Sequence, residues 1–346
     1  MAGPYENLAL ALDRLPNRFP ASSTGIEQEI LKRIFTPEEA HLGSYLDAEH
    51  ASIETIAERT GLDEGTCRSC LQQMAKRGLV WFEKSDNQVK FRLAPFIVGI
   101  YEAQEMDHTL AHLFEQYMAG WGAKDILGSE PPLHRVIPAQ SSIKSEWIMP
   151  YDDIRSVLES MKMFRVEDCT CRVERQQTGH ACEFPTRMCL SFSTVECPPG
   201  PNHISKEEAL DILDRAEEIG LVHTVSNTAN GVGYVCNCCG CCCGILRGIN
   251  EWGIQNSVAQ SNFYAVIDSE LCSGCSTCIE RCQVKAISDQ DGISVVDRQR
   301  CIGCGLCVTG CPNSAAHLEP KPADEVIVPP LDFTAWEQAR QAHRVN

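Results

Sequence analysis

The sequence predicts an α+β chain of several domains, and three observations indicate that class. Helix caps and apolar periodicity fill the first part of the chain, and two alternating segments that predict strands follow them. Eleven closely spaced cysteines lie in the middle, and one cysteine motif occurs twice near the C-terminus. A chain of 346 residues has room for two or three domains. We place the boundaries at 1–100, 101–165, 166–262, 263–320 and 321–346, the last being a tail.

The first hundred residues predict helices. Thr36 precedes Pro37 and Glu39, which is the pattern of a capping box with proline at the first helical position. A second helix is expected over 52–60, with Gly61 as its stop, and a third from Asp63 to a stop at Gly78.

Two short segments after the third helix alternate apolar and polar side chains. VWFEK and VKFRL are separated by the turn residues Ser85, Asp86 and Asn87, so they predict a hairpin. Helices followed by such a hairpin resemble a winged helix-turn-helix domain. Residues 52–93 hold seven basic and six acidic side chains, and this balance of +1 is a poor match to a phosphate backbone. We therefore favour a protein-docking role for this domain over DNA binding.

Cys67 and Cys70 form a C-x-x-C pair within the third expected helix. They share one helical face with Leu71 and Met74. We interpret both as small apolar side chains of a core and not as half of a metal site.

The middle of the chain contains further helix signals. A helix is expected from about residue 100 to 120, and a linker follows it. Another is expected over 152–164, and a third over 205–220, where Ser205 and Glu208 form a capping box and Gly220 is the stop. From these signals we expect a helical, cysteine-rich middle domain.

The strongest motif is a doubled one. Residues 272–282 read CSGCSTCIERC and residues 301–312 read CIGCGLCVTGCP, and both have the spacing C-x2-C-x2-C-x3-C. In two-cluster ferredoxins the fourth cysteine of each run binds the other cluster. One 4Fe-4S cluster should therefore bind Cys272, Cys275, Cys278 and Cys311, and the second should bind Cys301, Cys304, Cys307 and Cys282. Two zinc ions on the same thiolates are a disfavoured alternative.

Residues 263–318 thus resemble a bacterial two-cluster ferredoxin. Residues 286–297 fit the hairpin that joins its two halves. Gln283 stands where the first motif would usually have proline, a change that removes no cluster ligand.

The remaining cysteines predict a further metal site whose type stays open. Cys197 belongs to the same group by position, and His180 is expected to be a polar neighbour and not a ligand. We favour one or two additional iron–sulfur clusters over structural zinc or unligated thiols, because soft ligands are dense here. In an extended chain Cys236 and Cys238 would face away from Cys239, Cys241 and Cys243, whereas a helix could instead begin near Cys241. The candidate ligands are Cys169, Cys171, Cys182, Cys189, Cys236, Cys238, Cys239, Cys241, Cys242 and Cys243.

The order of these motifs, from about residue 30 to 320, resembles a family of multidomain 4Fe-4S dicluster proteins of anaerobic bacteria. The resemblance implies an accessory electron-transfer role beside larger oxidoreductases.

Composition narrows the location and the partners. The 21 cysteines, together with an opening segment unlike a secretory leader, favour a reducing cytoplasm. No apolar run is long enough to cross a bilayer, so direct membrane insertion is not expected. The net charge of −17 disfavours nucleic acid and favours a redox protein or larger oxidoreductase with a basic docking surface.

The sequence therefore favours a non-catalytic electron-transfer subunit. It has neither a dinucleotide-binding nor a phosphate-binding glycine motif. Two alternatives remain open: a redox-sensing DNA-binding regulator, and a small reductase whose middle cluster keeps an open iron.

Overall fold

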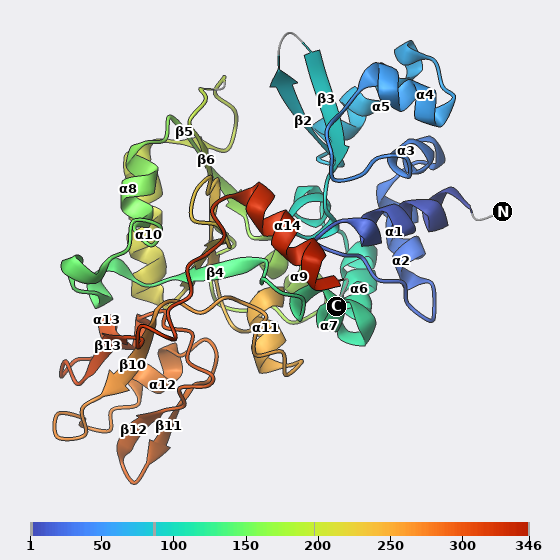
Figure 1. The fold of residues 1–346 in the computed structure, drawn as a ribbon. Coiled ribbons are helices and arrows are strands. Elements are labelled where there is room, and N and C mark those ends of the chain that lie inside the picture. The colour runs from blue at the N-terminus through green and yellow to red at the C-terminus, as the bar shows by residue number, and fades with distance from the viewer. Residues whose placement is uncertain (1–2, 86–87, 197, 345–346) are drawn as a thin grey trace. The chain divides into compact units, whose positions relative to one another are not determined.

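The computed structural model describes residues 3–85, 88–196 and 198–344 (Figure 1). The chain divides into two compact units. Unit 1 comprises Met1–Ile126 and Glu174–His180, and unit 2 comprises Leu127–Val173 and Ala181–Asn346. Helices and strands occur in both units, which confirms the α+β class.

Unit 1 consists of helices and one small antiparallel sheet with the strand order β1-β3-β2. Its helices are α1 (Pro4–Arg14), α2 (Ile26–Ile34), α3 (Pro37–Gly43), α4 (Ile53–Thr60), α5 (Glu64–Lys76) and α6 (His108–Tyr117), and α7 (Ala123–Leu127) ends at the boundary. Its strands are β1 (Ala51–Ser52), β2 (Val80–Ser85) and β3 (Gln88–Leu93), and short turns occur at η1 (Phe96–Ile100), η2 (Tyr101–Ala103) and η3 (Met118–Gly122).

The helix caps read from the sequence are confirmed in unit 1. Thr36 and Glu39 form the expected capping box of α3, and the Asp63 side chain accepts the Thr66 N–H at the start of α5. Gly61 ends α4 in the left-handed conformation. The β2–β3 hairpin also forms as expected, although the turn residues Asp86 and Asn87 lie outside the described residues.

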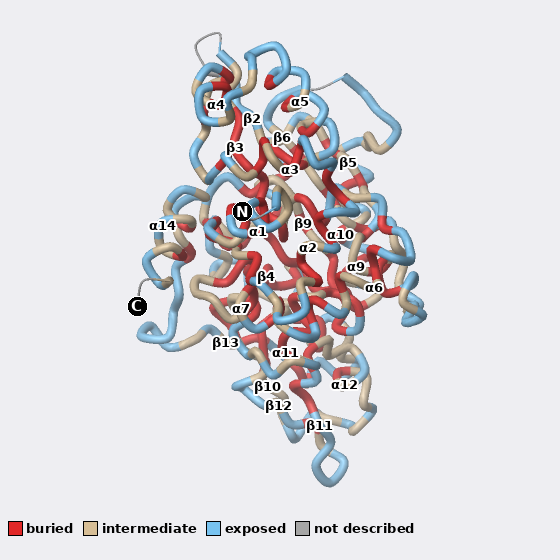
Figure 2. Tube along the Cα trace, turned by 90° about the vertical axis from the view of Figure 1, so that its right-hand side faces the viewer, coloured by how far each residue is buried: buried red, intermediate tan, exposed pale blue. Residues whose placement is uncertain are grey.

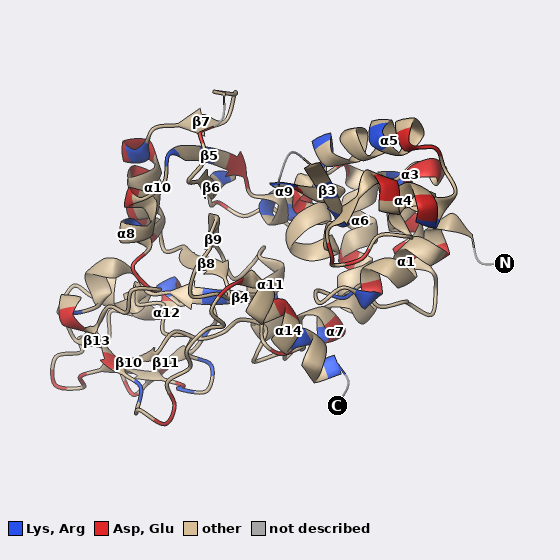
Figure 3. Cartoon of the chain, turned by 45° about the horizontal axis from the view of Figure 1, so that its top comes forward, with Lys and Arg blue, Asp and Glu red and all other residues tan. Residues whose placement is uncertain are grey.

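Charged side chains of both signs occur on the helices of unit 1 (Figure 3). Helix α5 has both Arg68 and Glu64, and α4 has both Arg59 and Glu58. The C-x-x-C pair of α5 serves its core, because Cys67 is fully buried and Cys70 Sγ lies 3.8 Å from the sulfur of Met74.

Unit 2 is built on a six-stranded antiparallel sheet with the order β4-β8-β9-β6-β5-β7. Much of it is buried, including all of β4 (Figure 2). The strands are β4 (His134–Ile137), β5 (Met163–Asp168), β6 (Arg187–Ser193), β7 (His203–Ile204), β8 (Val222–Ser226) and β9 (Tyr234–Cys238). Its helices are α8 (Ile154–Glu159), α9 (Thr170–Gln177), α10 (Lys206–Ile219) and α11 (Gly244–Asn250), with turns η4 (Gln140–Ser142) and η5 (Ser145–Trp147). The second half of α9 belongs to unit 1.

Helices α8 and α10 pack on one face of this sheet. Leu158 and Leu213 from the helices meet Val166, Leu190 and Val235 from three strands in one buried cluster. The capping box and the left-handed stop expected for α10 are both present. Because strand side chains alternate, Cys189, Cys236 and Cys238 lie on the opposite face.

The expectation of a helical middle domain is wrong, because this sheet forms its centre. The period-2 signal was present in the sequence, where Met188, Leu190 and Phe192 alternate with less apolar side chains along β6. Cysteines occupy several of the alternating positions of β6 and β9, and a dense run of cysteines indicates a metal site more strongly than it indicates a strand.

The C-terminal part of unit 2 consists of two short helices and two strand pairs. Strand β10 (Phe263–Ile267) pairs with β13 (Ala316–Pro320), and β11 (Ile287–Gln290) pairs with β12 (Ile293–Val296) as the expected hairpin. Helices α12 (Thr277–Arg281) and α13 (Leu306–Thr309) follow the cysteine loops.

The expected tail contains a docked helix, α14 (Phe333–Arg344). Arg340 is fully buried and donates to the carbonyls of Ser129 and Pro131, and the Trp336 indole N–H donates to Pro132 O. Among the described helices, none combines the length and the apolar character that crossing a bilayer requires.

Candidate metal centres

The two cysteine loops of the C-terminal part share one backbone design. Gly274 and Gly303 occupy equivalent places and both have positive φ, at 67° and 69°. The next equivalent pair, Ser276 and Gly305, also has positive φ, at 64° and 75°. Each loop therefore curls in the same way before a short helix begins, so the repeated spacing produces a repeated structure.

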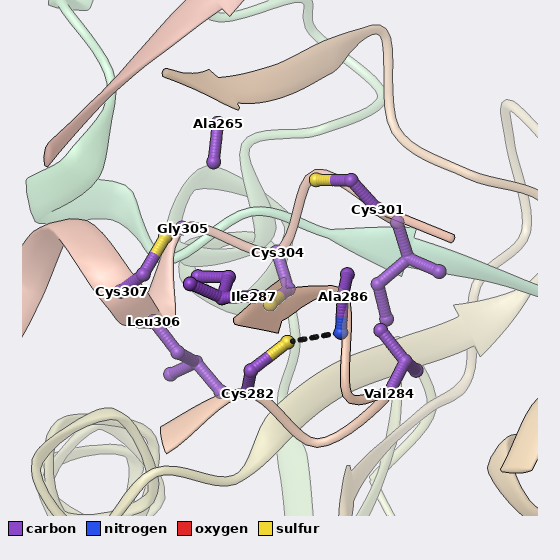
Figure 4. Close-up of a pocket in the computed structure, with 11 residues that line it drawn as sticks. Ala265, Cys282, Val284, Ala286, Ile287, Cys301, Cys304, Gly305, Leu306 and Cys307 are labelled. Carbon is purple, nitrogen blue, oxygen red and sulfur yellow. Dashed lines mark hydrogen bonds between the residues drawn. The ribbon is translucent and has the colours of Figure 1, made fainter. Parts of the chain in front are cut away.

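Four cysteines line one pocket in this region (Figure 4). They are Cys282 from the first motif and Cys301, Cys304 and Cys307 from the second, the set that the sequence assigns to one cluster. The pocket measures about 330 Å³ when the open solvent at its mouth is included, and its remaining walls are chiefly apolar. Burial raises the pKa of Cys304 to about 12 and also raises the pKa of Cys282 and of Cys307, so these three thiols keep their protons until a cation replaces them. Soft donors in an apolar cradle fit a 4Fe-4S cluster.

The other cysteine loop is more open to solvent. Cys275 is exposed and Cys272 is half-buried, whereas Cys278 is buried. Backbone N–H groups of Ser294 and Gly274 lower the pKa of Cys272, and Thr277 lowers that of Cys275. Hydrogen-bond donors thus surround these sulfurs, as a thiolate-bound cluster requires. Cys311, the fourth predicted ligand, is half-buried directly after α13.

Gln283, which replaces the usual proline, joins the ferredoxin-like part to the sheet. Its side chain donates to Gly220 O at 2.9 Å and accepts the Gly240 N–H at 2.8 Å. Its carbonyl accepts the side-chain amide of Asn250 at 2.8 Å. A Cβ on Gly240 would lie 1.9 Å from Gln283 O, so the two segments meet without room for a side chain. The departure from proline was visible in the sequence, but its partners were not.

Arg281, one residue before Cys282, makes a second connection. Its guanidinium donates to the carbonyls of Glu217 and Glu218 at the C-terminal end of α10 and to Leu306 O in α13. These bonds connect the residue before Cys282 to the last turn of α10 and to the start of α13.

The ten candidate cysteines of the middle region separate into two sets. In the first set, each thiol is close enough to the next to shift its pKa, and these pairs of neighbours close into a ring. The order around this six-thiol ring is Cys169, Cys171, Cys243, Cys238, Cys236 and Cys189. The second set is Cys182, Cys239, Cys241 and Cys242, whose sulfurs all lie within 4.8 Å of one another.

The six-thiol ring forms because several elements end at one place. Thr224 pairs with Cys236 between β8 and β9, and Glu167 pairs with Cys189 between β5 and β6. The contacts with Cys236 and Cys243 lower the pKa of Cys238 to about 6. No three sulfurs of the ring lie within 4.8 Å of one another among the described residues, so the ring is wide.

A hydrogen-bonded chain leads away from this ring. Thr224 Oγ1 lies 3.4 Å from Cys238 Sγ and 3.2 Å from His134 Nδ1, and His134 Nε2 lies 2.9 Å from the Tyr234 hydroxyl. Burial lowers the pKa of His134 to about 4 and keeps its imidazole neutral. No local sequence signal predicts this hydrogen-bonded chain, because its members come from three strands.

The observed division differs from both expected arrangements of residues 236–243. The strand ends at Cys238 and α11 begins at Gly244, so an extended segment and a helix both occur. Cys243 therefore joins Cys236 and Cys238 instead of Cys239 and Cys241.

Arg172 lies between the two thiol sets. Its guanidinium donates to Asn237 O at 2.7 Å and to Pro185 O at 3.0 Å. Thiol contacts from Cys241 and Cys242 lower the pKa of Cys239 far below its usual value, and Arg172 adds to that effect. A buried cation beside both sets offsets part of their negative charge. His180 is exposed and belongs to neither set, and Cys197 lies outside the described residues.

Comparisons with known proteins agree with the geometry of the C-terminal part. Residues 264–312 match the family model of the 4Fe-4S dicluster domain. No curated protein and no solved structure matches the chain. The matched segment contains both cysteine loops and the pocket of Figure 4. The chain is therefore an iron–sulfur protein with a ferredoxin-type domain near its C-terminus.

Proposed function

We propose that this chain is an electron-transfer protein that moves single electrons between a partner and its own interior. Two 4Fe-4S clusters supply the one-electron chemistry. Cys272, Cys275, Cys278 and Cys311 hold the outer cluster, and Cys282, Cys301, Cys304 and Cys307 hold the inner one. The six-thiol ring holds a further iron–sulfur cluster, since six soft ligands on a wide ring suit several metal atoms better than one.

The contact between Gln283 and Gly240 supports this route more than any other observation. Gln283 directly follows Cys282, a ligand of the inner cluster, and its side chain accepts the Gly240 N–H. Gly240 belongs to the segment between Cys238 of the ring and Cys243 of the ring. Hydrogen bonds therefore connect the inner cluster site to the chain segment that supplies the ring.

The partner is a larger low-potential oxidoreductase or a soluble electron carrier with a basic surface. Exposure of Cys275 supports an outer cluster that such a protein can approach. A net charge of −17 favours a basic docking surface and increases the association rate. We infer a cytoplasmic, anaerobic setting from the density of thiols and low-potential clusters.

We assign the first hundred residues, with their winged-helix-like order of elements, to protein docking. Helices α4 and α5 display acidic and basic side chains together, and this mixture does not form a phosphate-binding surface. Titration of the full cluster-loaded chain against random duplex DNA at low salt should show no submicromolar binding. Tight binding that weakens steeply with salt would favour a DNA-binding regulator instead.

The electron-transfer proposal is tested by anaerobic reduction of the purified full chain. Iron analysis should give at least about eight irons per chain, and more than eight when the ring is loaded. Rapid mixing with a low-potential reductant, with EPR of frozen samples, should show one cluster reduced first and the others reduced later from it. A chain with fewer than eight irons, or with clusters that accept no electron, would contradict the proposal.

A further inference from the structure

The second thiol set, which we call the four-thiol site, is compact. Its sulfurs, from Cys182, Cys239, Cys241 and Cys242, all lie within 4.8 Å of one another, and Cys241 Sγ lies 3.7 Å from Cys242 Sγ. Four thiolates arranged tetrahedrally about one zinc ion, with bonds of about 2.3 Å, stand about 3.8 Å apart. The observed spacing is therefore that of ligands around a single ion.

The ferredoxin-type loops provide an internal reference for this spacing. All eight of their cysteines are described, and no three of these eight sulfurs lie within 4.8 Å of one another. A four-iron cube is larger than one ion, so its ligands must stand farther apart. The same chain thus contains wide sets where a dicluster domain is matched and one compact set in the middle region.

The surroundings of the four-thiol site suit a closed structural centre. Cys182 comes from the irregular segment 181–186, whereas the other three ligands lie between β9 and α11. Cys239 and Cys242 are each 1 % exposed and pack with Met188, Ala216 and Leu221. Cys182 and Phe184, both partly buried, also pack against this cluster.

Charge also agrees with a bound cation complex. Four thiolates and one divalent ion carry a net charge of −2, and the buried Arg172 guanidinium lies beside Cys239. Cys239 and Cys242 are buried, Cys182 is half-buried and Cys241 is exposed, so the site has a buried side and a side that solvent can reach.

We propose that Cys182, Cys239, Cys241 and Cys242 bind one tetrahedral metal ion, zinc or a lone iron, and not a four-iron cube. The ion fastens segment 181–186 to the loop that follows β9. Four-sulfur tetrahedral sites select these metals. Binding releases the thiol protons and makes loop closure dependent on the metal. This site lies outside the electron route proposed above, which uses the two ferredoxin clusters and the six-thiol ring.

The test uses the full chain, purified anaerobically, and its Cys182→Ala variant. Zinc and iron per chain should fall by one ion in total, and the reducible clusters should keep their EPR signals. The Cys70→Ala variant is the matched control, because Cys70 is half-buried in unit 1 beside Met74 and belongs to neither thiol set. Its metal content should equal that of the wild type.

A loss of about four irons from the Cys182→Ala chain, or no loss of metal, would overturn the proposal. If the Cys182→Ala variant does not fold, spectroscopy of the wild-type protein tests the single-ion proposal. X-ray absorption at the zinc edge should then show four sulfur ligands at about 2.3 Å, or Mössbauer spectra should show one isolated iron. Absence of both signals from the wild-type protein would reject the single ion. Clusters that still accept electrons would leave the electron-transfer proposal intact.

Discussion

The two halves of the ferredoxin-type domain have the same cysteine spacing and the same loop conformation, yet their surroundings differ. Cys275 of the first loop is exposed. Cys301 and Cys307 of the second are only 8 % and 7 % exposed, and Ala139 N–H donates to Cys304 O. The cysteine motif therefore determines the local turn, whereas the neighbouring segments determine how far solvent reaches the cysteines of each loop.

Access has chemical consequences for a cluster. Solvent exposure, nearby charge and hydrogen bonds to sulfur set the reduction potential. The outer loop therefore suits exchange with a partner, and the inner loop suits exchange within the chain.

Removing one ligand from each loop should give the largest effect. Cys275→Ala and Cys304→Ala should each lose about four irons per chain. The Cys304→Ala chain should also show the larger fall in melting temperature, because its pocket is packed against the rest of unit 2. Anaerobic iron analysis and thermal unfolding measure both. Equal falls in melting temperature would mean that the inner loop is no better supported than the outer one.

A side chain at Gly305 should distort the inner loop. Its Cβ would lie 2.0 Å from Ser142 Oγ, and φ is +75°, so Gly305→Ala should cost about 2 to 4 kcal/mol in the free energy of unfolding. Ser276→Ala at the equivalent outer position is the control and should change it by less than about 0.5 kcal/mol. Denaturant unfolding measures the difference. Similar values for the two variants would remove the structural contrast.

Gln283→Ala should weaken the connection between the inner cluster and the cysteine-rich segment. Loss of its two side-chain hydrogen bonds should cost about 1 to 2 kcal/mol and slow the second phase of reduction. Gln299→Ala, an exposed change in the same domain, should leave both unchanged. Rapid-mixing kinetics with EPR detection separates these outcomes, and an unaltered second phase would show that electrons take another path.

Ser294→Ala should have the smallest effect and should act on the outer cluster. Ser294 Oγ lies 3.2 Å from Cys278 Sγ, and its hydroxyl can donate to that sulfur once it is a thiolate. Loss of one such bond should lower the reduction potential of the outer cluster by roughly 20 to 60 mV. Redox titration of Ser294→Ala against Ser288→Ala, an exposed control on β11, checks this. A shift in the inner cluster instead would reverse the assignment of the two sites.

Local signals in the sequence predicted local structure well. The caps of α3, α5 and α10 and the β11–β12 hairpin all depend on residues close together in the chain, and all are confirmed. Each of these features involves short-range geometry that a residue pattern determines directly. The four cysteines of the pocket were instead grouped by the ferredoxin pattern, in which the fourth cysteine of one motif binds the other cluster.

Features that join distant segments could not be predicted in the same way. The partition of the middle cysteines depends on the register of β6 against β9, where Leu190 pairs with Val235 and so brings Cys189 near Cys236. Cys243 joins the ring only because the strand stops at Cys238 and α11 begins at Gly244. Neither the register nor that stop follows from cysteine spacing.

The six-thiol ring has a consequence for how the protein matures. Its members come from the end of β5, the start of α9, β6, β9 and the residue before α11, so no short peptide contains them all. A ferredoxin loop can capture iron soon after synthesis, whereas the ring exists only after the sheet has assembled. For the cluster that we propose in the ring, iron and sulfide must therefore reach an already folded acceptor, and overproduction beyond that supply should accumulate chains with filled loops and an empty ring.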